Sequence, residues 1–140
     1  MLVLDTDHLG EFQKGTSPAA QRLKRRLDEV SLPVATTVIS VEEIMRGWLA
    51  AIRRETQPGE QIRSYARLVD LFAFFAAWDI LGWEAPAVER LKSLRQRKVR
   101  IGTMDLKIAS IALAHDATVL TSNLRDFGQV PDLRAEDWLT

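Results

Sequence analysis

The sequence predicts an α/β protein in which helices cover both faces of a parallel sheet. Short apolar segments alternate along the chain with longer segments of helical periodicity, the order expected of strands joined by helical crossovers. The 140 residues fit one compact domain, and a hydrophobic content of 46% is enough for a core. We therefore expect a single domain over residues 1–140, because no repeat or long linker divides the chain.

The first elements follow from an apolar run and two helix start signals. Residues 1–5, MLVLD, predict a short buried strand that ends on an acid. Asp7 can then cap a short helix that begins at His8, because Asp is a favoured N-cap residue. Ser17-Pro18 combines a capping serine with proline at the first helical position, which predicts a helix to about Val30.

The middle of the chain predicts two strands and two long helices. Residues 34–37, directly after Pro33, are predicted to form a strand, and residues 41–55 are expected to be helical. Pro58-Gly59 breaks the chain, and the helix after it extends to about Trp78. Its apolar residues recur at helical spacing: Ile62, Tyr65, Leu68, Val69, Phe72 and Phe75. Residues 79–81 predict the third strand.

The last part of the chain repeats the alternation. Residues 86–98 are expected to be helical, and Gly102 ends a basic loop before a second helix over residues 103–115, with Thr103 as its N-cap. Residues 117–121 predict a strong strand, and residues 133–136 a short final one.

Composition narrows the class of function. Nineteen basic residues balance nineteen acidic ones, which disfavours a protein that coats nucleic acid through overall charge. The absence of cysteine excludes disulfides and thiolate metal sites. The N-terminus has no signal-peptide pattern, and the longest apolar run, residues 71–78, is far shorter than the roughly 20 residues that span a bilayer. We expect a cytoplasmic protein without a membrane segment.

Acidic residues stand where the carboxyl ends of strands and the first turns of helices meet one edge of the sheet. Ligand sites of open α/β sheets lie at this edge. Asp5 ends the first strand, and capping a turn is its alternative role. Glu43 also has a structural alternative, since Ser40 and Glu43 have capping-box spacing. Glu42 is the neighbour that a helix more readily turns to solvent.

Three further polar residues belong to the same edge. Asp105 lies in the first turn of a very apolar helix, where a buried charge needs a partner or a metal. Asn123 and Asp126 follow the strong strand, with capping and pairing to Arg125 or Arg134 as their structural alternatives. The histidines, His8 and His115, lack metal-ligand spacing, so we expect both to be structural or exposed.

Carboxylates packed together repel one another unless a cation joins them. Oxygen ligands select Mg²⁺ or Mn²⁺, and such ions can activate water against a phosphodiester. Basic segments at residues 22–26, 53–54 and 90–100 are individually typical of solvated helix faces. Several of them around one acidic site would hold a polyanion.

With these residues in view, the sequence resembles the PIN-domain nucleases, and among them the VapC-type toxins of toxin–antitoxin pairs. The resemblance rests on an ordered set of segments: LDTDHL at 4–9, ISVEEIMRG at 39–47, IGTMDLKIASIALAHDATVLTSN at 101–123 and LRDFGQVPDLRAEDW at 124–138. It implies a three-layer α/β/α sandwich with a metal-bound acid cluster at one sheet edge.

The resemblance also implies roles for individual residues. Asp5, Glu43 (four positions before Gly47) and Asp105 correspond to the first three metal-binding acids of the family. The fourth acidic position is occupied here by Asn123, a departure that weakens a second metal site, and Asp126 is the alternative residue for that position. Outer-shell roles are then expected for the remaining polar residues around the cluster: Thr6, Asp7, Thr103 and Asp126.

The implied activity is metal-dependent hydrolysis of RNA, with tRNA as a family-level substrate, by water attacking in line. The implied partners are a small VapB-type antitoxin and a second copy of the chain in a homodimer. Trp48, Phe74 and Trp78 are candidate contact residues, with core packing as their alternative. A second hypothesis, kept open by Asn123, is an inactive binding module for RNA or antitoxin. A third keeps the nuclease but changes its substrate to DNA or its task to RNA processing.

Overall fold

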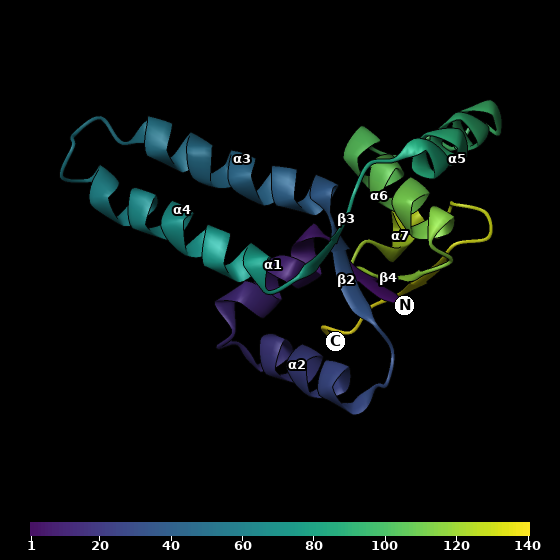
Figure 1. Ribbon diagram of the computed structural model, residues 1–140, viewed down its shortest axis with the longest axis horizontal. Helices are drawn as coiled ribbons and strands as arrows, with labels where there is room; N and C mark the ends of the chain where they lie inside the picture. The colour runs from purple at the N-terminus through teal and green to yellow at the C-terminus, as the bar shows by residue number, and fades with distance from the viewer.

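The fold is organised around a sheet of five parallel strands. A computed structural model describes residues 1–140. The strands are β1 (Leu2–Leu4), β2 (Val34–Thr37), β3 (Asp79–Leu81), β4 (Thr118–Leu120) and β5 (Arg134–Glu136). They lie in the order β3-β2-β1-β4-β5, and all four pairings are parallel (Figure 1). The expected parallel sheet is confirmed, and the first strand of the chain is its central one.

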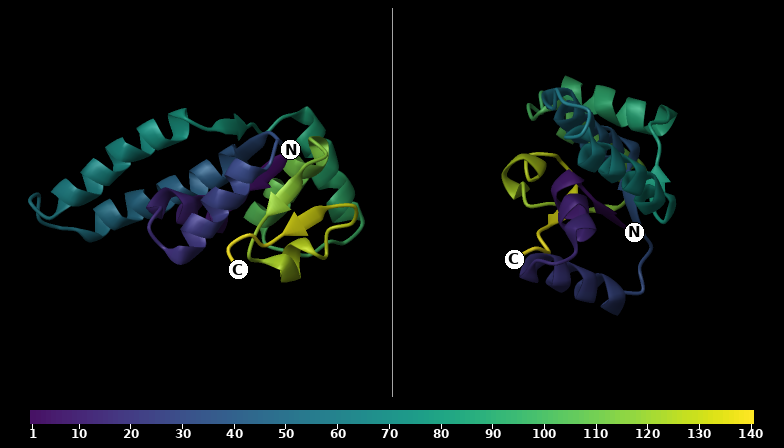
Figure 2. Two further views of the ribbon diagram at one scale, coloured as in Figure 1. Left: turned by 90° about the horizontal axis from the view of Figure 1, so that it is seen from below. Right: turned by 90° about the vertical axis from the view of Figure 1, so that its left-hand side faces the viewer.

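Helices cover both faces of this sheet. They are α1 (Thr6–Lys14), α2 (Pro18–Glu29), α3 (Val38–Arg54), α4 (Gln61–Ala76), α5 (Ala85–Gln96), α6 (Thr103–Ala114) and α7 (Leu124–Phe127). Successive side chains of a strand point to opposite faces. Leu2 and Leu4 accordingly pack with α1, α2 and α4, whereas Val3 packs with α5, α6 and α7. Figure 2 shows the resulting layers from two further sides.

Two helices begin earlier than the sequence predicts. Helix α1 begins at Thr6, because the Asp5 carboxylate accepts the N–H of His8 and is itself the N-cap, so the predicted cap at Asp7 is wrong. Helix α3 begins at Val38 directly after β2, because the Thr37 hydroxyl accepts the N–H of Ser40 at 3.2 Å. The structural alternative for Glu43, a capping box with Ser40, is therefore excluded, and Glu43 is left free for another role.

The other boundaries differ from the expected ones by three residues at most, and α2 begins at Pro18 behind the Ser17 cap as predicted. Helix α6 includes Thr103 as its first residue, and Gly102 occupies the N-cap position predicted for Thr103. The helical segment of residues 124–127 was not predicted, because four residues are too few for a periodic pattern.

Helices α3 and α4 form a hairpin that projects beyond the sheet (Figure 1). The apolar spacing of α4 predicts a core-facing side, but only part of that side is buried. Leu71 and Phe75 are buried, whereas four of its apolar residues are more than half exposed: Ile62, Tyr65, Val69 and Phe72. The hairpin extends past the neighbours that would cover them. None of the helices in the structure meets the length and apolarity needed to cross a bilayer.

The end of α5 is fixed by a Schellman motif. The N–H of Val99 donates to the carbonyl of Leu94 at 3.1 Å, and the N–H of Lys98 donates to that of Arg95 at 3.0 Å. Lys98 occupies the left-handed position, with a φ of 59°. Glycine is favoured there, and any other residue costs about 1 kcal/mol. The motif sets the direction in which the chain leaves α5 for α6.

Candidate metal centre

The candidate site lies at the carboxyl-terminal edge of the two central strands. Leu4 of β1 is in register with Leu120 of β4, and the N–H of Asp5 donates to the carbonyl of Leu120 at 3.0 Å. This pairing brings the residues after β1 beside those after β4. Asp7 of α1, for example, accepts the N–H of Ser122 at 3.3 Å.

Asp5 is a buried acid at the centre of this edge. The residue is only 4% exposed, and one of its carboxylate oxygens accepts the N–H of His8 at 3.2 Å. Burial, together with the nearby Asp7 carboxylate, raises the pKa of Asp5 to about 7. Asp7 behaves in the opposite way: burial disfavours its charge, but hydrogen bonding from His8 and Ser122 lowers its pKa to about 2.

Glu43 extends from α3 toward the start of α1. Its Oε1 accepts a 2.7 Å hydrogen bond from the Thr6 hydroxyl, which also lies 3.1 Å from the Ser40 hydroxyl. Glu42 instead pairs with Arg46 on the outer side of α3. The expectation that Glu43 rather than Glu42 faces the sheet edge therefore agrees with the side-chain contacts.

Asp105 reaches the same edge from the first turn of α6. The Asn123 amide donates to Asp105 at 3.2 Å and to Asp126 at 3.0 Å, so it joins two acids from different helices. Burial raises the pKa of Asp105, and the carboxylate of Glu43 raises it further, with smaller effects from Asp126 and Asp7. Thr103, by contrast, is exposed and makes no side-chain hydrogen bond with the cluster.

These acids have no positively charged side-chain partner from lysine or arginine. No such group lies within 4.0 Å of Asp5, Glu43, Asp105 or Asp126, whereas surface acids such as Glu42 have one. Carboxylates gathered without a lysine or arginine form a suitable donor set for a divalent cation that prefers oxygen. The residues present therefore fit Mg²⁺ or Mn²⁺.

A second grouping involves His8, which we expected to be structural or exposed. The ligand atoms of Asp5, Asp7 and His8 all lie within 4.8 Å of one another. The imidazole is fully buried, however, with Nδ1 2.7 Å from Asp7 and Nε2 accepting the backbone N–H of Trp138 at 3.1 Å. Both nitrogens are thus used inside the protein, and we interpret His8 as a positioning residue for Asp7 rather than as a metal ligand.

The protonation of His8 follows from the same contacts. Burial lowers the pKa of the ring, whereas hydrogen bonds to Asp5 and Asp7 raise it. The bond from the Trp138 N–H to Nε2 needs the lone pair of a neutral imidazole. Because Nε2 accepts this hydrogen bond, the contact outweighs the effect of the two carboxylates, and we assign the neutral ring with its proton on Nδ1 toward Asp7. The sequence did not predict the contacts of His8 with Asp7 and Trp138, although its position beside Leu9 at the start of a core-facing helix is consistent with burial.

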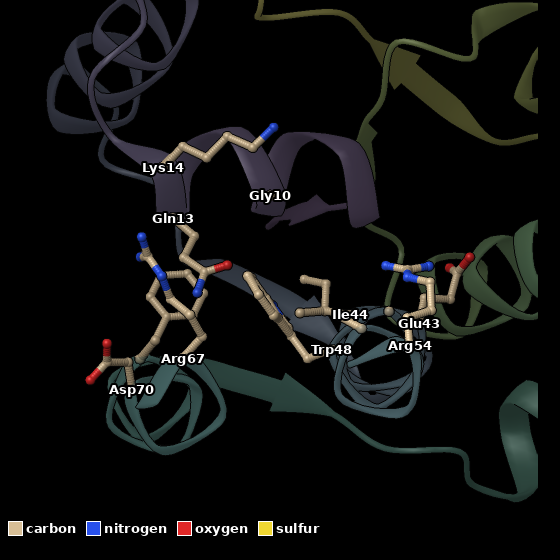
Figure 3. A pocket seen from close by; sticks show the side chains of 12 residues that line it. Gly10, Gln13, Lys14, Glu43, Ile44, Trp48, Arg54, Arg67 and Asp70 are labelled. Carbon is tan, nitrogen blue, oxygen red and sulfur yellow. The ribbon is translucent and has the colours of Figure 1, made fainter. Parts of the chain in front are cut away.

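A groove of about 760 Å³ extends from Glu43 between α1, α3 and α4 (Figure 3). Ile44 and Trp48 point from α3 into this space, and Lys14, Arg54 and Arg67 are among the residues around it. Two helical glycines, Gly10 and Gly47, also line the groove, and a Cβ added to either would meet nothing within 4 Å. The groove connects the acid cluster with the α3–α4 hairpin.

Comparison with known proteins identifies the family. The family model described as "PIN domain" matches residues 2–133. The chain belongs to the PIN-domain family. The matched residues include all of the acids described above, and the resemblance noted in the sequence is confirmed at the level of the family.

This PIN domain is similar to a curated ribonuclease over a short stretch. Forty-five residues are 44% identical to Ribonuclease VapC2 of Rickettsia felis (strain ATCC VR-1525 / URRWXCal2). The match covers 32% of this chain and 34% of the relative, so it spans only about a third of that protein's length.

Solved structures share the fold of this PIN domain over its whole length. DNA-bound VapBC from Salmonella typhimurium matches with a TM-score of 0.73 at 22% identity, covering 98% of this chain and 97% of that chain. VapBC2 from Rickettsia felis, bound to a DNA fragment from its promoter, gives a TM-score of 0.70 at 22% identity, covering 98% of both chains. The predicted α/β/α sandwich is thereby confirmed.

Proposed function

We propose that this PIN domain is a VapC-type endoribonuclease toxin that hydrolyses RNA phosphodiesters, tRNA among them, with Mg²⁺ or Mn²⁺. The observation that carries the proposal is the placement of Asp5, Glu43, Asp105 and Asp126 at one sheet edge, with no lysine or arginine within 4.0 Å of them. The raised pKa of Asp105 beside Glu43 supports the binding of a cation there. The short match to a ribonuclease agrees with this chemistry.

Each residue of the cluster has a proposed task. Asp5, Glu43 and Asp105 hold the ion, and the Asn123 side chain is the fourth ligand or keeps Asp105 in place through its amide. Thr6 orients Glu43 by donating to Oε1. Bound there, the divalent ion would neutralise phosphate charge and favour ionisation of an attacking water.

Three further residues have outer-shell tasks in this proposal. Asp126 holds the Asn123 amide, and Asp7 fixes the segment after β4 through the N–H of Ser122. The third, Thr103, was expected to orient ligands or waters through its hydroxyl. Because it is exposed and unbonded, we give it no ligand-orienting task.

An inactive module that binds RNA or antitoxin is the second candidate. The observation that favours it is the Asn123 amide, which already satisfies Asp105 and Asp126 where the family pattern places another acid. An amide is a weaker ligand for a hard cation than a carboxylate. The two candidates differ in whether any metal supports turnover.

Cleavage of a total small-RNA pool tests the proposed activity. The purified protein, freed of copurifying partners, is incubated with Mn²⁺, with Mg²⁺ and with EDTA. We expect discrete fragments with either metal and none with EDTA, and the fragment ends would identify the target. Absence of cleavage by a folded, partner-free sample under every metal would favour the inactive module.

Metal affinity should depend on pH near neutrality. Because the pKa of Asp5 is raised to about 7 and that of Asp105 is also raised, protons compete with the ion below pH 7. We expect the Mn²⁺ affinity to rise up to about tenfold from pH 6 to pH 7 and to level off above pH 8. Calorimetry in two buffers should show proton release on binding that is larger at pH 6 than at pH 8. An affinity that does not change with pH would contradict the assignment of Asp5 as a ligand.

The proposed partner is a VapB-type antitoxin with a segment seated in the groove beside Glu43. The solved neighbours are toxin–antitoxin complexes, which supports a partner of this class. Glycine inside a helix costs about 1 kcal/mol relative to alanine, and no contact in the structure requires Gly10 or Gly47 to lack a side chain. Space for a bound segment explains both glycines.

Filling the groove should separate partner binding from stability. Gly47→Leu replaces a helical glycine with a strong helix former in open space, so we expect equal or higher stability. The added side chain should weaken binding of the proposed VapB-type antitoxin by at least about tenfold. Titration calorimetry of Gly47→Leu, with Gly59→Leu outside the groove as the control, measures this effect. Unchanged affinity would place the partner elsewhere.

We also propose a cytoplasmic homodimer. The exposed apolar side of α4 supports association, because soluble proteins usually cover contiguous apolar patches. Trp48, Phe74 and Trp78, the aromatic candidates for partner contacts, are partly buried against the core. Of these, Trp48 and Phe74 also line the groove. Light scattering across a range of protein concentrations would test the dimer.

A further inference from the structure

The three basic segments of the chain differ in what their side chains do. In residues 22–26, Arg22 donates to the carbonyl of Leu139 at 2.7 Å and Arg26 stacks on the ring of Trp138. Their charges therefore help to hold the C-terminal residues against α2. In residues 53–54, at the end of α3, Arg54 lines the groove already described. Both segments have roles within the fold or at a known feature.

Residues 90–100, which we name the basic strap, have no such use. The strap contains six basic residues and no acid in a chain of zero net charge. Two of the six have an exposed ion pair, Lys92 with Glu89 and Arg97 with Asp132 at 3.8 Å. Pairs of this kind contribute little to stability. The other four have no carboxylate within 4.0 Å: Arg90, Arg95, Lys98 and Arg100.

The strap leads directly into the acid cluster. At the end of the Schellman motif, Val99 and Ile101 pack against the core, while Lys98 and Arg100, which alternate with them, stay exposed. The next residues begin α6, and Asp105 follows Arg100 by five positions. Five residues span at most about 18 Å even when fully extended. The backbone of Arg100 is therefore within about 18 Å of that of Asp105, a span of a few nucleotides.

Lys98 adds an independent observation. It occupies the left-handed position of the motif, where glycine would make the fold more stable. The backbone there is held by two hydrogen bonds, so the lysine is presented at a fixed place rather than on a loose loop. A cation kept at a conformational cost, without any partner in the protein, indicates a ligand outside it.

We propose that the basic strap binds the phosphate backbone of the RNA and directs the strand to the acid cluster. This inference rests on the proposed function and adds to it the surface that positions the substrate. A row of unpaired cations without exposed aromatic residues fits phosphates rather than bases, so the strap provides affinity without sequence selection. It also explains how a chain of zero net charge attracts a polyanion: the charge is local.

The test compares two triple variants of equal charge. In the strap variant, Arg95, Lys98 and Arg100 are each changed to Gln. In the control, the exposed and unpaired Arg25, Arg53 and Arg63 are changed to Gln. Binding of a labelled single-stranded RNA of 30 nucleotides is measured across salt concentrations, and cleavage of the small-RNA pool is followed in parallel.

We expect the strap variant to bind RNA at least about tenfold more weakly, with a salt slope reduced by about 2, since each lost phosphate contact removes about 0.7. Its KM for cleavage should rise with kcat unchanged, whereas the control should match the wild type. Equal RNA affinity and equal salt slope in the two variants, with an active wild type, would refute RNA binding by the basic strap and leave the proposed function standing. A wild type that neither binds nor cleaves RNA would overturn the proposed function together with it.

In the Lys98→Gly variant, thermal stability and RNA affinity should change in opposite directions. If Lys98 has only a structural role, the variant should only gain thermal stability. Glycine removes the conformational cost of the left-handed position and should raise the Tm by about 2–4 °C. Our proposal predicts this same gain together with RNA binding weakened by about two- to fivefold. A higher Tm with unchanged RNA affinity would show that Lys98 does not contact the substrate.

Discussion

Changing Asp105 to Asn should abolish metal-dependent cleavage while making the metal-free protein more stable. Asp105 is surrounded by like charges that raise its pKa, chiefly Glu43 after the effect of burial, so removing its charge relieves repulsion. The same change removes a proposed ligand. Bound metal contributes several kcal/mol of transition-state stabilisation, which corresponds to a loss of about 10²- to 10⁴-fold in rate.

The opposite signs of these two effects distinguish a ligand from a structural acid. An acid that served only the fold would lose stability when neutralised. Thermal unfolding in EDTA and RNA cleavage in Mn²⁺ measure the two effects on the same sample. Glu42→Gln is the matched control, since Glu42 lies on the outer side of α3 paired with Arg46 and should change neither. Cleavage by Asp105→Asn at the wild-type rate would refute the metal site.

Changing His8 to Ala should destabilise the protein by about 3 kcal/mol or more. The side chain is fully buried, so its loss creates a cavity. It also leaves the Trp138 N–H without its acceptor and Asp7 without its donor. Because Trp138 is held by this bond and by the stacked Arg26, the C-terminal residues should detach first. Denaturant unfolding and amide hydrogen exchange measure the two consequences.

Two further variants separate the causes. His8→Leu fills the cavity but restores no nitrogen, so we expect about 1–3 kcal/mol of the loss to remain. His115→Ala alters the other histidine, which is exposed at the end of α6, and should stay within about 0.5 kcal/mol of the wild type. A small effect of His8→Ala would mean that Trp138 is anchored mainly by its ring.

The sequence was sufficient to predict the sheet because short apolar segments alternate with segments of helical periodicity along most of the chain. It was less informative at helix starts, where a single hydrogen bond decides the cap. Ser40 and Glu43 have capping-box spacing, yet Thr37, at the end of β2, caps the helix first. The place where β2 ends therefore decides which residue caps α3, and it excludes the capping role for Glu43.

The role of His8 shows a different limit. Its partners include Trp138, 130 positions away, and no local pattern reports such a contact. The exposed side of α4 is a third case. Helical spacing identified its apolar residues, but whether a neighbour covers them depends on how far the α3–α4 hairpin extends past the sheet. Helical periodicity predicts an apolar face, but the packing of the layers decides whether another element covers that face.

The central position of β1 has a consequence for the timing of synthesis. The first strand made must wait for β4, whose residues pair with it from Thr118 onward, and Asn123 follows still later. Chains are made from the N-terminus, so a nascent or truncated product that lacks this last part has an open sheet and scattered acids. The proposed hydrolytic activity should therefore be absent from incomplete chains and should arise only when nearly all of the polypeptide has left the ribosome.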